Sequence, residues 1–575
     1  MKKKITAKKI LKYVFIFLVV LLVLNILPSF FYRVEVNKNP LQSFYKKGVY
    51  HMHSVFSDGK GTIDEITNAA AALNLDFVIL TDHGRPNIQS SMSTSWKNNV
   101  LLVGGSELSL HSGHLAVMGY KMPDYIFPPE PQEAINEIDN DKGVSFISHP
   151  FDNKVPWTDW DIQGFTGLEV LSSYSAARRA GILKILIFPL KYLIDSKYAL
   201  LNTMQYPTVN IKKWDSLNSG AKTSHRYYGI YALDAHAKLP ITKKIQLNFP
   251  TYKSMFEIMT VYVKVDHALE KNAHEAASTI VSSLREGNFF NVIEGIAPAN
   301  GFDVSIEKFC GGPGGGFSKE PPGRRRQKLE LLMPFDFETD VVVLKDGEVY
   351  QRIENNQKKK LEIEMKEPGV YRVEVYVPGN TFDHLPWIMT NPFFVGVRTP
   401  LPPSLPVKEK EVVLKRPLPD KNDSFKVEKN SRSQGAVTYE SSGEDEEITC
   451  FSFKLVKEST EDRNFWSVMA LRKRLNFSAY KGFVFEAKSD KKRRFWVEFR
   501  TGRKESEIWY RHSFLVDVEW KRYYIPFKKF HLTYGDKEQK EPELAKVTSI
   551  FFSINNANAY AGTGGTIFLK NSGLY

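Results

Sequence analysis

The stretch 48–54 reads GVYHMHS, an apolar run typical of a β-strand that ends in two histidines, His51 and His53. Side chains two residues apart on a strand point to the same side, so both imidazoles can bind one metal ion. A His-x-His pattern alone is weak evidence for a metal site. The residues that follow it therefore decide what these histidines do.

Seven more side chains of metal-ligand type end short apolar runs in the first 240 residues. They are Asp58 in SDGKG, His83 in LTDHG, Glu107 in GGSEL, His114 in GHLAVMG, His149 in ISHP, and Asp234 and His236 in LDAHA. Each motif alone could simply end a strand or form a turn. Mixed histidine and carboxylate sets suit Mn, Zn or Fe, so the nine residues together predict a centre for two or three divalent metals. A carboxylate such as Glu107 can bridge two ions, whose shared hydroxide would attack a phosphorus or carbonyl centre.

The order of strand and helix patterns between residues 49 and 294 predicts the fold of this region. Strand patterns such as FVILTDH and TGLEVLS alternate with helix patterns such as TIDEITNAAAALN. This alternation predicts a parallel α/β sheet or barrel. Most of the nine residues fall at the carboxyl ends of strands, where such folds place their active sites.

A helical insertion is expected over residues 175–219, which contain the apolar run GILKILIFPLKYLI. Lys184, Pro189, Lys191 and Asp195 interrupt the apolar pattern, which argues against a second membrane span. We expect a buried or membrane-apposed insertion instead.

The N-terminus predicts an anchor. Ile10–Phe31 is almost purely apolar and long enough to cross a bilayer, and it follows a basic tail over residues 1–9. The lysines favour a cytoplasmic N-terminus, which places the rest of a single-pass membrane protein outside the cytoplasm. A cleaved signal peptide is the alternative, although no small-x-small cleavage site follows.

The bulk composition predicts several folded domains. The chain has 575 residues, of which 42% are hydrophobic and 13% aromatic. Its net charge is +13, but no nucleic-acid-binding motif accompanies this charge, so we expect no nucleic-acid partner. Two cysteines, Cys310 and Cys450, exclude a disulfide framework by their number, although an exported protein could pair them.

The second half of the chain has β patterns. We expect a small Ig-like β-sandwich over residues 327–398, a Pro- and Lys-rich linker over 399–436, and a larger β-sandwich over 437–575.

Five motifs resemble, in this order, those of the PHP (polymerase and histidinol phosphatase) metallohydrolase domain over residues 47–298: HMHS…SDG, LTDHG, GGSE…GHLAVMG, ISHP and LDAH. The TGLEV and KWDSLNSG segments are most similar to CehA/McbA-type members. The resemblance implies a distorted seven-stranded β/α barrel that holds up to three metals and hydrolyses phosphoesters. One departure is Leu233, where the family usually has serine, but both ligands of that motif remain.

The resemblance also implies how the ligands divide. His51, His53, Glu107 and Asp234 would bind one metal, Glu107, His114 and His149 a second, and Asp58, His83 and His236 a third. Catalysis would run through the metals held by His51, His53, Glu107, His149 and Asp234.

Other residues near the motifs lie outside the ligand set. His111 is interpreted as a surface residue or as one that supports the metal ligands, Glu169 as structural, and Asp82 as either orienting His83 or capping a helix. Arg85, Arg178 and Arg179 could bind an anionic substrate, with plain solvation as the alternative.

The C-terminal region resembles a galactose-binding-like jelly roll, similar to carbohydrate-binding modules and CIA30-type domains. Trp496, Trp509, Tyr510 and Trp520 could stack on sugar rings, although the strand alternation places about half of them in the core.

The sequence thus predicts a membrane-anchored, extracytoplasmic phosphoesterase that acts on a small-molecule or envelope phosphoester. One alternative is an ester, amide or carbamate hydrolase that uses the same centre. The other is a cell-surface glycan-binding protein in which the barrel is only a scaffold.

Overall fold

The computed structural model divides the chain into two compact units. The first is Met1–Lys121 with Ile135–Pro403, and the second is Met122–Ala134 with Ser404–Tyr575. The residues that the structure describes are 7–35, 45–219, 225–240, 246–308, 327–334, 337–396, 413–419, 423–441, 447–457, 459, 464–502, 506–535 and 541–575.

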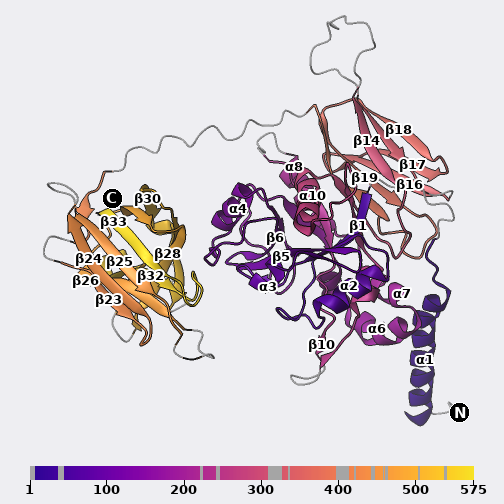
Figure 1. The fold of residues 1–575 in the computed structure, drawn as a ribbon. Coiled ribbons are helices and arrows are strands. Elements are labelled where there is room, and N and C mark those ends of the chain that lie inside the picture. The colour runs from indigo at the N-terminus through magenta and orange to yellow at the C-terminus, as the bar shows by residue number, and fades with distance from the viewer. Residues whose placement is uncertain are drawn as a thin grey trace, which may run out of the picture. The chain divides into compact units, whose positions relative to one another are not determined.

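The first unit is built on a distorted barrel of seven strands (Figure 1). In order around the barrel they are β1 (Tyr45–Tyr50), β2 (Phe77–Leu80), β5 (Val100–Leu110), β6 (Gly113–Met118), β7 (Val144–Ile147), β8 (Gly167–Ser172) and β9 (Tyr228–Ala232). The residues after β9 close the ring against those after β1, where Met52 and Ala235 form a parallel bridge. His53 N donates to Ala235 O at 2.9 Å across this closure. The seven-stranded β/α barrel is therefore present.

One barrel strand departs from the expected parallel arrangement. β6 runs antiparallel to both β5 and β7, while the other barrel strands that pair do so in parallel. Only His111 and Ser112 separate β5 from β6, and so short a connection can form only a hairpin. Two short strands, β3 (His83–Gly84) and β4 (Ser95–Lys97), also pair with β5.

Helices cover the barrel, and local sequence signals fix their ends. Helix α2 begins after Thr62, whose side chain and that of Glu65 form a capping box. The helix α10 ends at Gly287, where φ of 74° favours glycine. The helices outside the insertion are α2 (Ile63–Ala71), α3 (Ile88–Ser91), α4 (Pro131–Asn140), α9 (Tyr252–Phe256) and α10 (Ala273–Glu286).

The helical insertion begins two residues earlier than expected, at Ser173. It contains α5 (Ser173–Arg179), α6 (Ile182–Ile194), α7 (Ser196–Leu201) and α8 (Thr208–Asn218). A two-stranded ribbon of β10 (Leu239–Pro240) and β11 (Gln246–Leu247) follows β9.

The small β region continues the barrel's own sheet. β1 pairs with β12 (Thr260–Lys264), β12 with β13 (Phe289–Val292), and β13 with β20 (Ile388–Thr390). From there the sheet runs through β19 (Gly369–Tyr376) to β16 (Thr339–Lys345) and β17 (Glu348–Asn356), with β21 (Phe393–Val395) beside β19. The second sheet of the region is β14 (Asp303–Lys308), β15 (Gln327–Leu332) and β18 (Lys360–Met365). β14 thus precedes the start predicted at residue 327.

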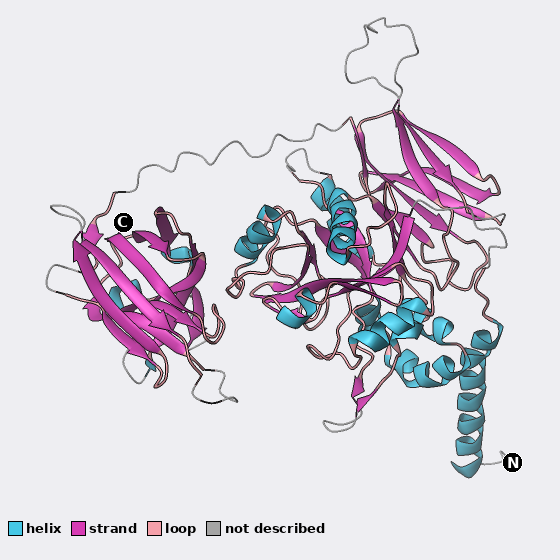
Figure 2. Ribbon diagram, viewed as in Figure 1, coloured by secondary structure: helices cyan, strands magenta, loops and turns pink. Residues whose placement is uncertain are grey.

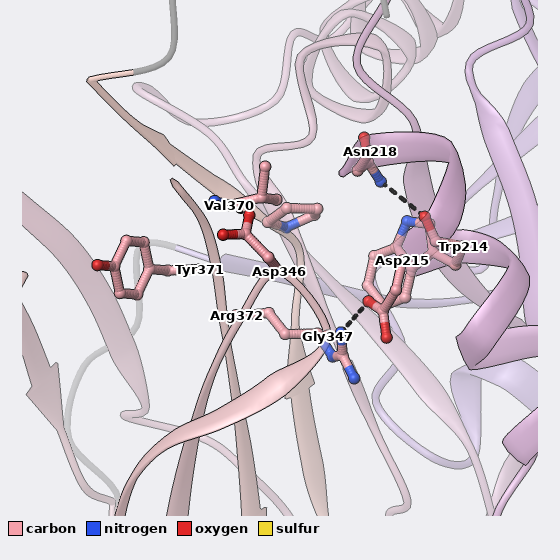
Figure 3. Close-up of a pocket in the computed structure, with 9 residues that line it drawn as sticks. Trp214, Asp215, Asn218, Asp346, Gly347, Val370, Tyr371 and Arg372 are labelled. Carbon is pink, nitrogen blue, oxygen red and sulfur yellow. Dashed lines mark hydrogen bonds and ion pairs between the residues drawn. The ribbon is translucent and has the colours of Figure 1, made fainter. Parts of the chain in front are cut away.

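Helix α8 joins the insertion to this β region (Figure 3). The Arg372 guanidinium pairs with the Asp215 carboxylate in a small pocket whose lining also includes Trp214, Gly347 and Tyr371. Asn218 Nδ2 donates to Trp214 O at 3.2 Å within α8. The pocket contains no predicted metal ligand, so we interpret it as part of the packing between α8 and the sheet.

The second unit is a sandwich of two six-stranded sheets (Figure 2). One contains β24 (Gln434–Ser441), β25 (Glu447–Lys454), β33 (Gly564–Leu574), β27 (Gly482–Ser489) and β30 (Lys521–Pro526), with β22 (Arg416–Pro417) on β33. The other contains β23 (Lys426–Lys429), β26 (Trp466–Leu475), β32 (Val547–Asn555), β28 (Arg493–Thr501), β29 (Ile508–Val516) and β31 (His531–Tyr534). A phenylalanine-rich core lies between the sheets.

One expectation for this unit is wrong. β22 and β23 fall inside the predicted linker 399–436, so the sandwich begins before residue 437. Proline and lysine suit edge strands, so their composition hid these two strands. Trp496 and Tyr510 are buried in the sandwich and cannot stack on a sugar, which agrees with the expectation that about half of the four aromatic candidates lie in the core.

The N-terminal helix α1 (Ala7–Phe31) is one helix that is long and apolar enough to cross a membrane. Its Lys12–Phe31 segment has a mean hydropathy of 2.8 and is largely exposed. At 1.5 Å per residue, such a segment is about 30 Å long, close to the thickness of a bilayer's hydrocarbon core.

Candidate metal centre

All nine predicted ligands meet in one cluster at one end of the barrel, where the parallel strands end and the antiparallel strand β6 begins. Glu107 on β5 lies at its centre and is fully buried. Its Oε2 faces His51 Nε2 at 3.5 Å, His53 Nε2 at 3.4 Å and His83 Nδ1 at 3.0 Å. Its Oε1 faces His114 Nδ1 at 3.3 Å and His149 Nε2 at 3.1 Å. One carboxylate is therefore surrounded by five imidazoles, as a bridging ligand would be.

Two aspartates complete the cluster. Asp234 Oδ1 lies 3.3 Å from His53 Nε2 and 3.6 Å from His51 Nε2, on the side of Glu107 Oε2. Asp58 Oδ1 lies 3.2 Å from His236 Nε2 and 3.8 Å from His83 Nε2. The side-chain nitrogens and oxygens thus form a continuous set of donors.

Three subsets of these side chains lie close enough to share an ion. They are His51, His53 and Glu107; His83, Glu107 and His114; and His53, Asp58, His83 and His236. The resemblance placed His83 only with Asp58 and His236, whereas the structure brings it near two subsets. The division of ligands among ions is thus a proposal, while their convergence is a structural fact.

Hydrogen bonds fix which ring nitrogen faces the centre. His51 Nδ1 lies 2.5 Å from Glu169 Oε1, and a carboxylate oxygen can only accept, so Nδ1 donates and Nε2 turns its lone pair to the cluster. His236 Nδ1 likewise donates to Asp234 O at 2.9 Å, which leaves Nε2 toward Asp58. Such contacts hold metal-ligating histidines in the required tautomer.

Glu169 is a positioning residue that the sequence interpretation took to be merely structural. Besides His51, it accepts a hydrogen bond from His149 N at 2.7 Å, so it holds two ligands at once. The signal was the acidic residue in GLEVLS, a strand that is buried along its whole length. An acidic side chain in such a strand needs donors, and these donors belong to the metal ligands.

Other side chains hold the loop between His53 and Asp58. Asp82 accepts from Ser54 N at 2.8 Å and from Ser57 Oγ at 2.5 Å, so its hydrogen bonds support this loop. Tyr252 OH donates to His53 O at 2.7 Å, and Lys238 Nζ donates to Asp58 O at 2.9 Å. The sequence patterns gave no indication of Tyr252 or Lys238.

The three predicted arginines lie in different surroundings. Arg178 on α5 pairs with Asp152 at 2.9 Å and covers the Tyr174 ring at 4.7 Å, and that ring lies 5.2 Å from the His236 ring. Arg85 is half-buried two residues after His83, whereas Arg179 is exposed at the end of α5. Arg178 is therefore the arginine that the structure connects to the cluster. His111 is exposed in the hairpin turn.

Backbone strain also marks the cluster. His51, His149 and Asp234 have φ angles of 65°, 29° and 52°, a region that non-glycine residues rarely adopt. Such conformations persist where the surrounding structure enforces them, and they gather at functional sites.

The charges of the cluster favour cations. Burial alone would raise the pKa of Glu107 and Asp234, but the surrounding histidines hold both pKa values well below the usual range. Burial would lower the pKa of His53 and His149, but the nearby Asp234 and Glu107 carboxylates raise the pKa of each to about 9. Burial lowers the pKa of His83 to about 4, against the pull of Glu107.

The donors present fit divalent metals. Among the described residues, the buried atoms His83 Nδ1, Glu107 Oε2 and His114 Nδ1 have no hydrogen-bond partner although they face one another. Buried polar atoms without partners are costly, and they converge here on a common point. Histidine and carboxylate donors are those that Zn, Mn and Fe prefer.

Comparisons with known proteins give one family match and several similar solved structures. The family model of Complex I intermediate-associated protein 30 (CIA30) matches residues 431–564. No curated protein matches the chain. Among solved structures, the chain is similar to a two-domain protein from Bacteroides vulgatus ATCC 8482 that contains a predicted PHP-like metal-dependent phosphoesterase. The two chains are 14% identical with a TM-score of 0.30, and the match covers 63% of this chain and 98% of that one.

The chain is also similar to two carbohydrate-binding modules of Clostridium thermocellum cellulases. For the family 11 module of Lic26A-Cel5E, identity is 16% and the TM-score 0.22, covering 26% of this chain and 86% of that one. For the family 30 module of Cel9D-Cel44B, identity is 15% and the TM-score is 0.18, and the match covers 25% of this chain and 90% of that one. Because these similarities are distant, we infer the chemistry of the chain from the geometry of the cluster.

Proposed function

We propose that this chain is a metal-dependent hydrolase, and specifically a phosphoesterase. The observation that carries the proposal is Glu107, a fully buried carboxylate whose two oxygens face five imidazoles within 3.0–3.5 Å. His51, His53, Glu107 and Asp234 would hold one metal, Glu107, His114 and His149 a second, and Asp58, His83 and His236 a third. Bound divalent metals supply Lewis acidity and an activated water at neutral pH.

The chain's own residues prepare the site for that chemistry. Glu169 fixes the tautomer of His51 and the backbone of His149, so both donors are set before a substrate arrives. Glu107 and Asp234 stay ionised because the histidines hold their pKa values low. Arg178 would bind a non-bridging phosphoryl oxygen, a role that matches its planar fork of donors.

We place the catalytic unit outside the cytoplasm, anchored by α1. The support is the apolar Lys12–Phe31 segment together with the lysines that precede it. Positive charge before an apolar span keeps the N-terminus on the cytoplasmic side. Residue Tyr32 at the end of the helix donates from its hydroxyl to Gly295 O at 2.6 Å, which joins the anchor to the catalytic unit.

A glycan-binding role for the second unit is a separate proposal. Of the four aromatic candidates, Trp509 and Trp520 remain half-buried. Trp509 lies 4.7 Å from the exposed ring of Tyr534, and two such rings could form a stacking surface for a sugar. A glycan array with the full chain in detergent would test this role, and loss of any signal in Trp509→Ala would support it.

The test of the proposed reaction uses the full chain in detergent micelles loaded with Mn, Zn or Fe. We expect hydrolysis of bis-p-nitrophenyl phosphate or its monoester, and its loss in His53→Ala. His274→Ala is the matched control, because His274 is an exposed histidine on α10, outside the cluster. Hydrolysis of p-nitrophenyl acetate or a carbamate without any phosphoester activity would instead assign the centre to ester, amide or carbamate chemistry.

A further inference from the structure

Helix α6 (Ile182–Ile194) carries its apolar side chains outward. Its exposed positions follow the spacing of one helix face, and each of them is apolar. The most exposed are Leu193 at 82%, Ile182 at 70% and Leu186 at 69%. The whole face, called here the α6 stripe, consists of Ile182, Leu183, Ile185, Leu186, Pro189, Leu190 and Leu193.

The lysines of the same helix point inward. Lys191 is only 3% exposed, and its ammonium lies 5.4 Å from the centre of the Tyr198 ring. Lys184 Nζ donates to Asn202 O at 2.7 Å. A helix that faces water has the opposite arrangement, with leucines inside and lysines outside. The protein therefore holds this helix in an orientation that water would oppose.

The contact between α6 and α1 indicates what surrounds the α6 stripe. Helix α6 contacts α1, and in Figure 1 it lies beside the end of α1 that is remote from the N-terminus. The Tyr32 ring at that end packs against Tyr198 at 5.6 Å and Phe382 at 5.2 Å. The α6 stripe is thus held where α1 would leave the membrane.

Aromatic rings lie on the side of α6 that meets the rest of the unit. The rings of Phe188 and Tyr192 pack against Phe249 at 5.7 Å and 4.5 Å. The Tyr192 hydroxyl is hydrogen-bonded to Ser254 Oγ at 2.6 Å. Tyrosine with an apolar body and a polar tip is enriched at the level of lipid headgroups.

We propose that α6 is an interfacial membrane helix, whose stripe lies among the acyl chains of the outer leaflet beside α1. The occupant of the face is a lipid bilayer, because the stripe is uncharged and lies next to a helix of membrane-spanning length. A helix with one such apolar face lies in the plane of the interface and does not cross the bilayer. The inference rests on the proposed membrane location of the chain.

The test places a fluorescent label on the stripe of the full chain. Cys310 and Cys450 are replaced by serine, Leu186→Cys is labelled with a polarity-sensitive dye, and the protein is reconstituted in phosphatidylcholine vesicles. Lipids brominated at shallow or deep acyl positions then quench the dye. Val349→Cys, an exposed apolar position on β17, is the matched control, and Leu22→Cys in α1 reports on the anchor.

We expect loss of fluorescence at Leu186 that is strongest with the shallow bromine position, and no loss at Val349. The same result at Leu193→Cys guards against a local effect of one label. The inference would be overturned if the label at Leu186 were quenched no more than the label at Val349. It would also be overturned if a second copy of the chain, and not lipid, covered the label. The Leu22 label separates the two ideas, because its quenching tests the anchor independently of α6.

Discussion

Glu169→Gln removes one negative charge and one acceptor from the support of the metal centre while it keeps the size of the side chain. In the wild type, one oxygen accepts from His51 Nδ1 at 2.5 Å and the other accepts from His149 N at 2.7 Å. Glutamine has only one acceptor oxygen, so its amide group must face one of these two donors. Either His51 loses its fixed tautomer or the His149 backbone loses its partner.

The size of the effect follows from these two contacts. Removing a group that orients a metal-ligating histidine typically costs 10–100-fold in metal affinity or activity, which is about 1.4–2.7 kcal/mol. We expect the variant to lose metal at correspondingly lower chelator concentrations and to show a similar fall in kcat/KM for a phosphodiester. Metal content after dialysis against graded chelator measures the first effect, and initial rates at saturating metal measure the second.

The control is Glu294→Gln, because Glu294 also accepts two hydrogen bonds, from Thr260 and from Tyr262. It lies outside the nine-ligand cluster, so its variant should retain both metal and activity. Wild-type metal content and wild-type kcat/KM in a folded Glu169→Gln protein would refute the role assigned to Glu169.

Three further predictions follow from other parts of the structure. His53→Ala should abolish hydrolysis and lower metal content, since His53 belongs to two of the three ligand subsets, while His274→Ala changes neither; equal loss in both would contradict a specific role for His53. The pKa values of His53 and His149, about 9, mean that both are protonated at pH 7 without metal, so metal must displace these protons. Metal affinity should therefore rise up to about pH 9 and then level off, with proton release seen as a buffer-dependent heat of binding; a pH-independent affinity would contradict this. Burial raises the pKa of Glu130 from 4.5 to about 7, so the folded protein favours the neutral form of this carboxyl group. The free energy of unfolding is therefore highest below pH 4.5 and falls as the pH rises through 7. Glu130→Gln should raise stability at pH 8 by about 3 kcal/mol and leave it unchanged at pH 4.5, as measured by thermal melts; the same shift at both pH values would contradict this reading.

The barrel and the ligand types could be predicted because they have strong local signals. Apolar runs followed by histidine or a carboxylate predict both a strand and the position of a candidate ligand, so Glu107 and His149 could be singled out from the sequence alone. The direction of β6 could have been read from the two-residue connection at His111 and Ser112, which allows only a hairpin. The ends of the C-terminal sandwich were harder, because edge strands such as β22 tolerate proline and lysine.

The support of the centre could not be predicted, because it depends on contacts between distant residues. Glu169 and His51 are separated by 118 positions, and Tyr252 reaches His53 across 199. No spacing rule relates such pairs. The positive φ angles of His51 and Asp234 also lack a sequence signal, because glycine is the residue that usually marks them.

The most direct test of the account is the metal content of the full chain and of its Glu107→Ala variant. Both proteins are purified in detergent with Mn, Zn and Fe supplied, and are measured by elemental analysis beside hydrolysis of bis-p-nitrophenyl phosphate. The account predicts at least two tightly bound metal ions in the wild type, and loss of both metal and activity when the bridging carboxylate is removed. A folded wild-type protein that retains no metal, or a Glu107→Ala protein with unchanged metal and activity, would contradict it.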